Sequence, residues 1–299
     1  MPAITQPAGI YSMLYAFFDA KGRLDRAAMR RQVEACVKSA VHGVAALGLA
    51  TEVAKLAESE RRTLVEWVAE ELAGRLPLAV TVVGATVAEQ VAFARFAHSL
   101  GAAWVILQPP RIAGAGDAEL VPFFSEVMER LDMTVAVQNA PEYIGVGLSH
   151  AGIARLARTH THFTVLKGEG PALLIRELIE QTGGRLAVFN GRAGLELTDN
   201  LRAGCAGMVP GIDTMERQAR IFDLMRAGEE ARAEALYREI LPAIVFAMQS
   251  VEHLVCYGKR LAAARLGLGP VHDRAPAQAP TEFGLRCVQR YARALGPLP

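Results

Sequence analysis

The chain has 299 residues, of which 52% are hydrophobic, and its 32 Lys and Arg residues nearly balance its 31 Asp and Glu residues. A near-neutral chain without a basic run is a poor candidate for binding nucleic acid, and its hydrophobic content excludes general disorder. The four cysteines have no short spacing that would indicate a zinc site or a disulfide framework, which favours a reduced compartment.

The N-terminal segment, residues 1–13, lacks the basic region and apolar run of a secretory leader. No stretch of about 18 apolar residues, the length of a membrane-spanning helix, occurs in the sequence. We therefore expect a cytoplasmic protein without a membrane partner.

One pattern recurs along the chain: a short apolar run, then a turn residue, then an amphipathic segment of helical period. The apolar runs predict strands at residues 9–18, 43–49, 78–84, 104–108, 134–139, 163–169, 186–190 and 207–211. The amphipathic segments predict helices at residues 25–39, 59–73, 86–100, 117–130, 149–158, 171–181, 194–202 and 214–226. Thr86, three residues before Glu89, predicts a capping box at the start of the third helix.

The strands read as near-continuous apolar runs, such as AVTVV and WVIL, which is typical of strands buried on both faces of a parallel sheet. Eight strand–helix units in succession favour an α/β fold of the (β/α)8 or TIM-barrel type over an open doubly wound sheet. No GxGxxG follows the first strand, which argues against a dinucleotide fold. Residues 1–228 are expected to form the barrel. Residues 229–299, with helices predicted at 229–249, 252–266 and 281–295, are expected to form a C-terminal helical extension packed on it.

In a barrel of this type the functional site lies at the carboxyl ends of the strands. Polar residues gather at these ends, as a pocket requires. The strand ends read LATE at 49–52, QPPR at 108–111, QNAP at 138–141, KGE at 167–169, NGR at 190–192 and VPG at 209–211.

Lys167 and Glu169 are the strongest catalytic candidates. They lie two residues apart on a strand and should therefore point to the same face. Burial disfavours the ammonium form of a lysine, and a neutral amine in a dry pocket is a nucleophile for carbonyl carbon. Glu169 beside it could move protons. The alternative is a lysine at a strand end that reaches solvent and pairs with Glu169.

Other candidates carry weaker signals. Arg111 and Arg192 could each bind a substrate carboxylate through two hydrogen bonds, or could be solvated or interface arginines. Tyr143 could donate a proton or close a loop. His160 and His162 begin a strand, at the wrong end of the barrel for chemistry, so a metal site there is not expected. Glu52 is expected to fix a loop or cap the following helix, and His253 is expected to be a core or interface histidine.

These residues resemble the dihydrodipicolinate synthase and N-acetylneuraminate lyase family of class I aldolases over nearly the whole chain. Lys167 is similar to the family's Schiff-base lysine, and Asn139 with Pro141 resembles its YNxP motif. The resemblance implies a (β/α)8 barrel with C-terminal helices, often a homotetramer, that forms an imine with pyruvate or a longer 2-oxo acid. The other matching residues are Gly9-Ile10-Tyr11, Phe18-Asp19, Gly22, Gly43 to Glu52, Leu56, Glu58 to Arg61, Gly101-Ala102, Pro109-Pro110 and Gly191.

The chain also departs from the family pattern. Leu49 and Ala50 replace two threonines, which leaves Thr51 as the nearby hydroxyl. Gln138 replaces the tyrosine before the Asn, and Ile112 stands where a neighbouring subunit lends a relay tyrosine. Tyr143 lies about where the synthases have a carboxylate-binding arginine. Because the Thr-Tyr-Tyr proton relay is absent, dihydrodipicolinate synthase activity itself is not expected.

The L-2-keto-3-deoxyarabonate dehydratases depart in a similar direction. They resemble this chain in having Gln-Asp-Ala-Pro near residues 138–141, Ser-Glu near 51–52 and Lys-Ile-Glu near 167–169. Dehydration needs an imine, a base for the neighbouring proton and an acid for the leaving hydroxide. Glu169 could serve as both base and acid, and the Gln138 amide could hold a substrate hydroxyl.

We therefore predict a Schiff-base lyase that dehydrates a 2-keto-3-deoxy sugar acid, without a metal or other cofactor and as a homo-oligomer, either a dimer or a tetramer. Retro-aldol or aldol chemistry with pyruvate is the alternative reaction, and a non-catalytic protein that binds a 2-oxo acid is the alternative class. The predicted catalytic residues are Lys167 and Glu169, and the predicted substrate contacts are Thr51, Gln138, Tyr143, Gly191 and Arg111.

Overall fold

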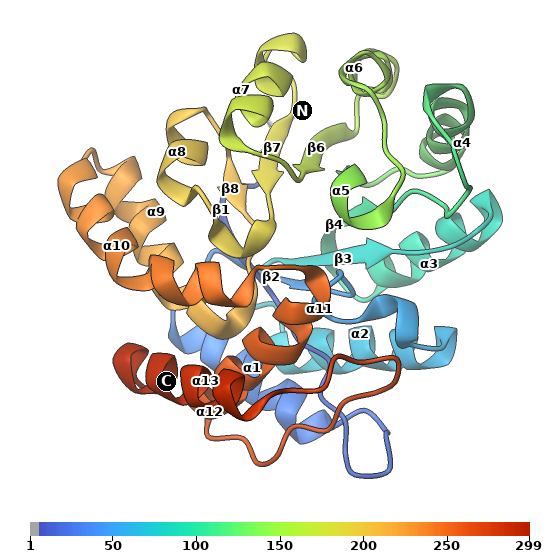
Figure 1. The fold of residues 1–299 in the computed structure, drawn as a ribbon. Helices are drawn as coiled ribbons and strands as arrows, with labels where there is room; N and C mark the ends of the chain where they lie inside the picture. Colours follow the sequence, from blue (N-terminus) through green and yellow to red (C-terminus); the bar gives the residue numbers. More distant parts are fainter. Residues whose placement is uncertain (1–5) are drawn as a thin grey trace.

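The computed structural model describes residues 6–299. The expectation that residues 1–13 are not a secretory leader therefore falls partly on residues 1–5, which lie outside the described residues. Eight parallel strands close into a barrel in sequence order, and the eighth pairs with the first (Figure 1). The predicted (β/α)8 barrel is confirmed. The strands are β1 (Gly9–Met13), β2 (Gly43–Ala46), β3 (Leu78–Val82), β4 (Ala102–Leu107), β5 (Val135–Asn139), β6 (Phe163–Gly168), β7 (Ala187–Asn190) and β8 (Gly207–Met208).

Helices surround the barrel, and those of the C-terminal extension, orange to red in Figure 1, lie along one side with α11 reaching toward its centre. The helices that follow the strands are α1 (Arg26–Lys38), α2 (Glu58–Leu72), α3 (Val87–Ser99), α4 (Asp117–Glu129), α5 (Pro141–Ile144), α6 (His150–Thr159), α7 (Ala172–Gln181), α8 (Leu197–Arg202) and α9 (Met215–Arg226). The extension contains α10 (Glu230–Ala247), α11 (Val251–His253), the π-helical turn η4 (Leu254–Gly258), α12 (Lys259–Leu266) and α13 (Glu282–Leu295).

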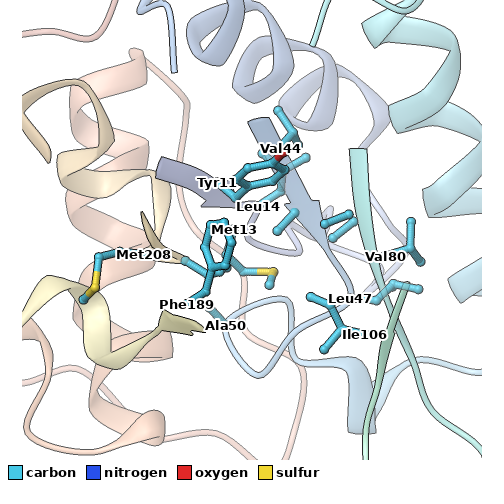
Figure 2. Close-up of a cluster of buried hydrophobic side chains, with 14 of the residues drawn as sticks. Tyr11, Met13, Leu14, Val44, Leu47, Ala50, Val80, Ile106, Phe189 and Met208 are labelled. Carbon is cyan, nitrogen blue, oxygen red and sulfur yellow. The ribbon is translucent and has the colours of Figure 1, made fainter. Parts of the chain in front are cut away.

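Large side chains fill the barrel interior. Tyr11 lies edge-on to Trp104 and to Phe189, with ring centroids 5.2 and 5.5 Å apart. Figure 2 shows Tyr11 and Phe189 in one cluster with Met13 and Met208. Because the interior is a packed apolar core, polar chemistry has room only above it, where the strands end.

The predicted strand at residues 9–18 is wrong in its second half, because β1 ends at Met13. The chain stays buried beyond that point, but the side chain of Gln32 takes the place of a neighbouring strand. Its Oε1 accepts from the Tyr15 N–H at 2.9 Å, and its Nε2 donates to the Tyr15 carbonyl at 3.0 Å.

The predicted helix at 194–202 begins only at Leu197, because Arg192, Ala193 and Glu196 have positive φ angles of 53°, 55° and 55°. The predicted helix at 252–266 is divided by the π-helical turn η4. The short helix α5 was not predicted. The capping box of α3 is confirmed, with the N–H of Glu89 donating to Thr86 Oγ1 at 3.2 Å.

No single helix within residues 6–299 is long and apolar enough to cross a membrane. The helical segments Glu230–Ala247 and Val251–Leu266 pass that test only together, by length and composition, and they meet at a bend of 104°.

Buried charges join the extension to the barrel. The fully buried Lys259 of α12 forms an ion pair with Glu52, which follows β2, and also donates to the Ala16 carbonyl at 3.3 Å. Lys55 donates to the other oxygen of the Glu52 carboxylate at 2.6 Å. This cluster fixes the loop after β2 against the extension.

Lys259→Met should lower the free energy of unfolding by about 3 kcal/mol, because the buried Glu52 carboxylate loses one of its two cations. Urea unfolding followed by circular dichroism measures the loss. Removing both charges in Glu52→Gln/Lys259→Met should recover much of it, since no unpaired charge then stays buried. If Lys259→Met alone is as stable as the unmodified protein, this ion pair does not hold the extension in place.

Candidate active site

A small cavity of about 40 Å³ lies at the carboxyl ends of the strands. Lys167, Glu169 and Arg192 are the charged residues that line it. Met13, Leu49, Ala50 and Val209 form apolar walls from the barrel, and Met248, Val251 and Leu254 form a wall from the extension. The cavity is therefore a mostly apolar chamber with three charges in its lining.

Lys167 on β6 and Glu169, directly after the end of that strand, meet in this cavity, as their spacing of two residues predicts. Lys167 Nζ donates to Glu169 Oε1, and each side chain is only 5% exposed. Burial lowers the pKa of Lys167 to about 7, because desolvation disfavours its ammonium form. Near neutral pH a large fraction of this amine is therefore unprotonated and able to attack a carbonyl carbon.

Gln138 holds Glu169 from the neighbouring strand. It pairs with Lys167 in the register of β5 and β6, and its Nε2 donates to Glu169 Oε1 at 3.2 Å. The Oε1 atom of Gln138 is buried and has no hydrogen-bond partner among residues 6–299. Gln138 is not among the residues that line the cavity, but this orphaned acceptor belongs to the side chain that holds Glu169, which does line it.

Gly191 leaves the space that Glu169 occupies. A Cβ atom at Gly191 would lie 2.8 Å from Glu169 Cδ and 2.9 Å from its Oε1. The buried Asn190 fixes this approach, because its Oδ1 accepts from the Gly191 N–H at 2.8 Å and its Nδ2 donates to the Gly170 carbonyl at 2.8 Å. Asn190, to which we assigned no role from sequence, ties the end of β7 to the loop beyond Glu169.

The two candidate arginines lie in different places. Arg192 lines the cavity, whereas the exposed Arg111 lines an outer pocket of about 790 Å³. Tyr143 also lines the outer pocket, and its hydroxyl accepts from Arg192 Nε at 3.3 Å. Leu49 and Val251 border both spaces, so the outer pocket adjoins the cavity.

Thr51 does not line the cavity. It is fully buried, and its hydroxyl donates to the Leu14 carbonyl at 2.6 Å. The hydroxyl therefore holds the loop after β2 against the chain that follows β1, while Leu49 and Ala50 of the same loop face the cavity.

The wall formed by Met248, Val251 and Leu254 was missed from the sequence. Apolar residues on an amphipathic helix carry no signal that separates a site wall from ordinary core. A volume of about 40 Å³ holds little more than one water molecule. A three-carbon acid needs more room, so its entry requires these side chains or the Lys167–Glu169 pair to shift.

The residues expected to be structural, Glu52, His160, His162 and His253, are not among those that line the cavity. Glu52 is held by Lys259 and Lys55. His160 contacts Ser125 Oγ at 3.1 Å, and His253 packs against Phe246. Within residues 6–299 no three His, Cys, Asp or Glu side chains gather as metal ligands.

Comparison with known proteins agrees with this geometry. The model of the dihydrodipicolinate synthetase family matches residues 6–281. The chain belongs to this family. An L-2-keto-3-deoxyarabonate dehydratase of Azospirillum brasilense is 30% identical over 244 residues, which cover 79% of this chain and 78% of that protein.

Solved structures of family members superpose closely. A candidate dihydrodipicolinate synthetase from Pseudomonas aeruginosa has a TM-score of 0.88 at 27% identity, covering 96% of this chain and 99% of that one. YagE of Escherichia coli K12, solved in complex with pyruvate, has a TM-score of 0.87 at 20% identity, covering 98% and 99%. Family membership makes this chain an enzyme of the class I, Schiff-base-forming lyase type.

The low pKa of Lys167 predicts the pH dependence of imine formation. With a pKa of about 7, the rate should fall about tenfold per unit at acid pH and level off above about pH 8. Cyanoborohydride trapping of pyruvate across this range measures the rate. A rate that keeps rising to about pH 10 would indicate a lysine with an ordinary pKa and contradict the burial argument.

Gly191→Ala should lower kcat by about 10- to 100-fold, because the new methyl group displaces the Glu169 carboxylate. Steady-state kinetics on the active substrate measures the change. Gly269→Ala is the matched control, since its added methyl group meets nothing within 4 Å and should leave kcat unchanged. Equal kinetics for the two variants would show that the position of Glu169 does not limit the reaction.

Proposed function

We propose that the protein dehydrates a 2-keto-3-deoxy sugar acid through an imine on Lys167. The buried Lys167–Glu169 pair is the observation that carries this proposal. The dehydratase of Azospirillum brasilense supports the reaction, because it is 30% identical to this chain over most of both chains. The absence of hydroxyls at Leu49 and Ala50 argues against a relay of the synthase type.

The reaction begins when neutral Lys167 attacks the C2 carbonyl and water leaves, which forms the imine. The imine acidifies C3, and the carboxylate of Glu169 removes a proton from that carbon. The electron pair moves toward C4 and expels its hydroxyl, which takes the proton from Glu169 and leaves as water. Hydrolysis of the imine then frees the 2-oxo acid product and restores Lys167.

The surrounding residues support these steps. Gln138 keeps Glu169 oriented through its Nε2, and its free Oε1 would accept from the substrate's C4 hydroxyl. Gly191 provides the space for the carboxylate. Tyr143 and Arg111 in the outer pocket would contact the part of a longer substrate that extends beyond the cavity. Thr51 would act indirectly, by holding the Leu49–Ala50 loop.

Retro-aldol cleavage to pyruvate is the second candidate reaction. Its support is the solved complex of YagE with pyruvate, since YagE is named as a candidate 2-dehydro-3-deoxy-D-gluconate aldolase and the same imine serves both reactions. Assembly into a dimer or tetramer and a cytoplasmic location stay predictions.

Supplied with a 2-keto-3-deoxypentonate, the enzyme should release a dehydrated 2-oxo acid and no pyruvate, as followed by proton NMR. Glu169→Gln should lower kcat by about 100-fold or more, because it removes the base, while the imine on Lys167 still forms. If pyruvate is the main product instead, the reaction is retro-aldol cleavage and the proposed dehydration is wrong. Full activity in Lys167→Ala would contradict both reactions.

A further inference from the structure

Two residues line both spaces of the site. Leu49 and Val251 border the cavity of about 40 Å³ that contains Lys167, and they also border the outer pocket of about 790 Å³. Because even a three-carbon acid needs more room than this cavity has, the carbons of a longer acid must extend into the outer pocket. On the basis of the proposed function, we propose that Leu49 and Val251 form a neck through which the substrate's carbon chain passes, and that their size determines which 2-oxo acids bind.

The loop after β2 holds the Leu49 side of the neck. The Leu49 carbonyl accepts from the Glu52 N–H at 2.9 Å, and Glu52 is tied to Lys259 of the extension by their buried ion pair. The Thr51 hydroxyl donates to the Leu14 carbonyl at 2.6 Å. These contacts fix the loop within three residues of Leu49. The half-buried Leu49 side chain is therefore held at the edge between the two spaces.

A break between helices presents Val251 on the other side of the neck. The chain bends by 104° between α10 and the helical segment that begins at Val251. Ser250, in the break, is extended with a φ angle of −159°, and its hydroxyl accepts from the His253 N–H at 3.1 Å. This cap starts α11 at Val251. The half-buried Val251 side chain therefore reaches both the cavity and the outer pocket.

The lining changes in polarity beyond the neck. The side chains of Leu49 and Val251 have no hydrogen-bonding group, so they favour an unbranched, apolar part of the substrate. Polar side chains whose donors and acceptors can bind hydroxyl groups line the outer pocket, among them Lys55, Arg111, Tyr143, Glu252 and Gln278. The arrangement fits a 2-oxo acid with an unbranched chain at the neck and hydroxyl groups on its far end.

The test compares pyruvate, 2-oxohexanoate and the branched 4-methyl-2-oxopentanoate in cyanoborohydride trapping, followed by intact-protein mass spectrometry. None of these acids has a hydroxyl at C4, so none can react beyond the imine. All three must enter, but bound pyruvate is too short to occupy the neck, and its trapping efficiency is therefore the reference.

Val251→Ala and Leu49→Ala should each raise the efficiency with the branched acid, relative to pyruvate, by about 10-fold, because they widen the neck. Val251→Phe should lower the efficiency with 2-oxohexanoate, relative to pyruvate, by about 10-fold or more, because it narrows the neck. Misfolding lowers trapping of every acid and cannot produce the gain with the branched acid.

Val245 provides the matched controls, because it lies on α10 of the same extension, is 45% exposed and lines neither space. Val245→Ala and Val245→Phe should leave both ratios unchanged. Absence of the gain from both Val251→Ala and Leu49→Ala would overturn the neck, as would an unmodified enzyme that traps pyruvate but not 2-oxohexanoate. If the unmodified enzyme traps none of the three acids under conditions that label a class I aldolase, the proposed function itself fails, which distinguishes the two failures.

Discussion

The burial of one ion pair, Lys167 with Glu169, determines the rest of the site. Two ionisable groups lie where the packed interior of the barrel ends, in a chamber with largely apolar walls. Desolvation of the amine lowers its pKa to about 7, and the adjacent carboxylate supplies the partner that makes burial tolerable. Gln138 and Gly191 serve the same pair, one by a hydrogen bond and the other by leaving space. Lys167 is thus positioned as the nucleophile and Glu169 as the proton carrier in a cavity that excludes bulk water.

The C-terminal extension completes this site. Met248, Val251 and Leu254 close the side of the cavity that the barrel leaves open, and they exclude the water that would raise the pKa of Lys167. Lys259 anchors the extension to the loop after β2 through Glu52. Tyr237 of α10 anchors it to the turn that carries Arg192. The extension wall, the loop after β2 and the turn with Arg192 therefore form one connected unit around Lys167. A shift of the extension would change both the access of substrate to the cavity and the charges around Lys167.

Features that depend on neighbouring residues in the sequence, such as strands and the face to which a side chain points, could be predicted from the sequence. The apolar runs predicted the strands of the barrel, and the spacing of Lys167 and Glu169 predicted that their side chains would meet. Contacts between distant segments could not be predicted in this way. Nothing local shows that Gln32 replaces a strand beside Tyr15, or that Thr51 turns toward the Leu14 carbonyl rather than the cavity. Arg111 and Arg192 both follow a predicted strand, so no local pattern placed them differently. In the structure Arg192 lies in a turn with positive φ angles and lines the cavity, whereas Arg111 lines the outer pocket.

The central claim is that the buried amine of Lys167 is the nucleophile. The most direct measurement is borohydride reduction in the presence of a 2-oxo acid, followed by peptide mass spectrometry to locate the adduct. One reduced adduct is expected, on Lys167, and it should be absent from Lys167→Ala. An adduct on another lysine, or none under conditions that label a known class I aldolase, would contradict the Schiff-base mechanism.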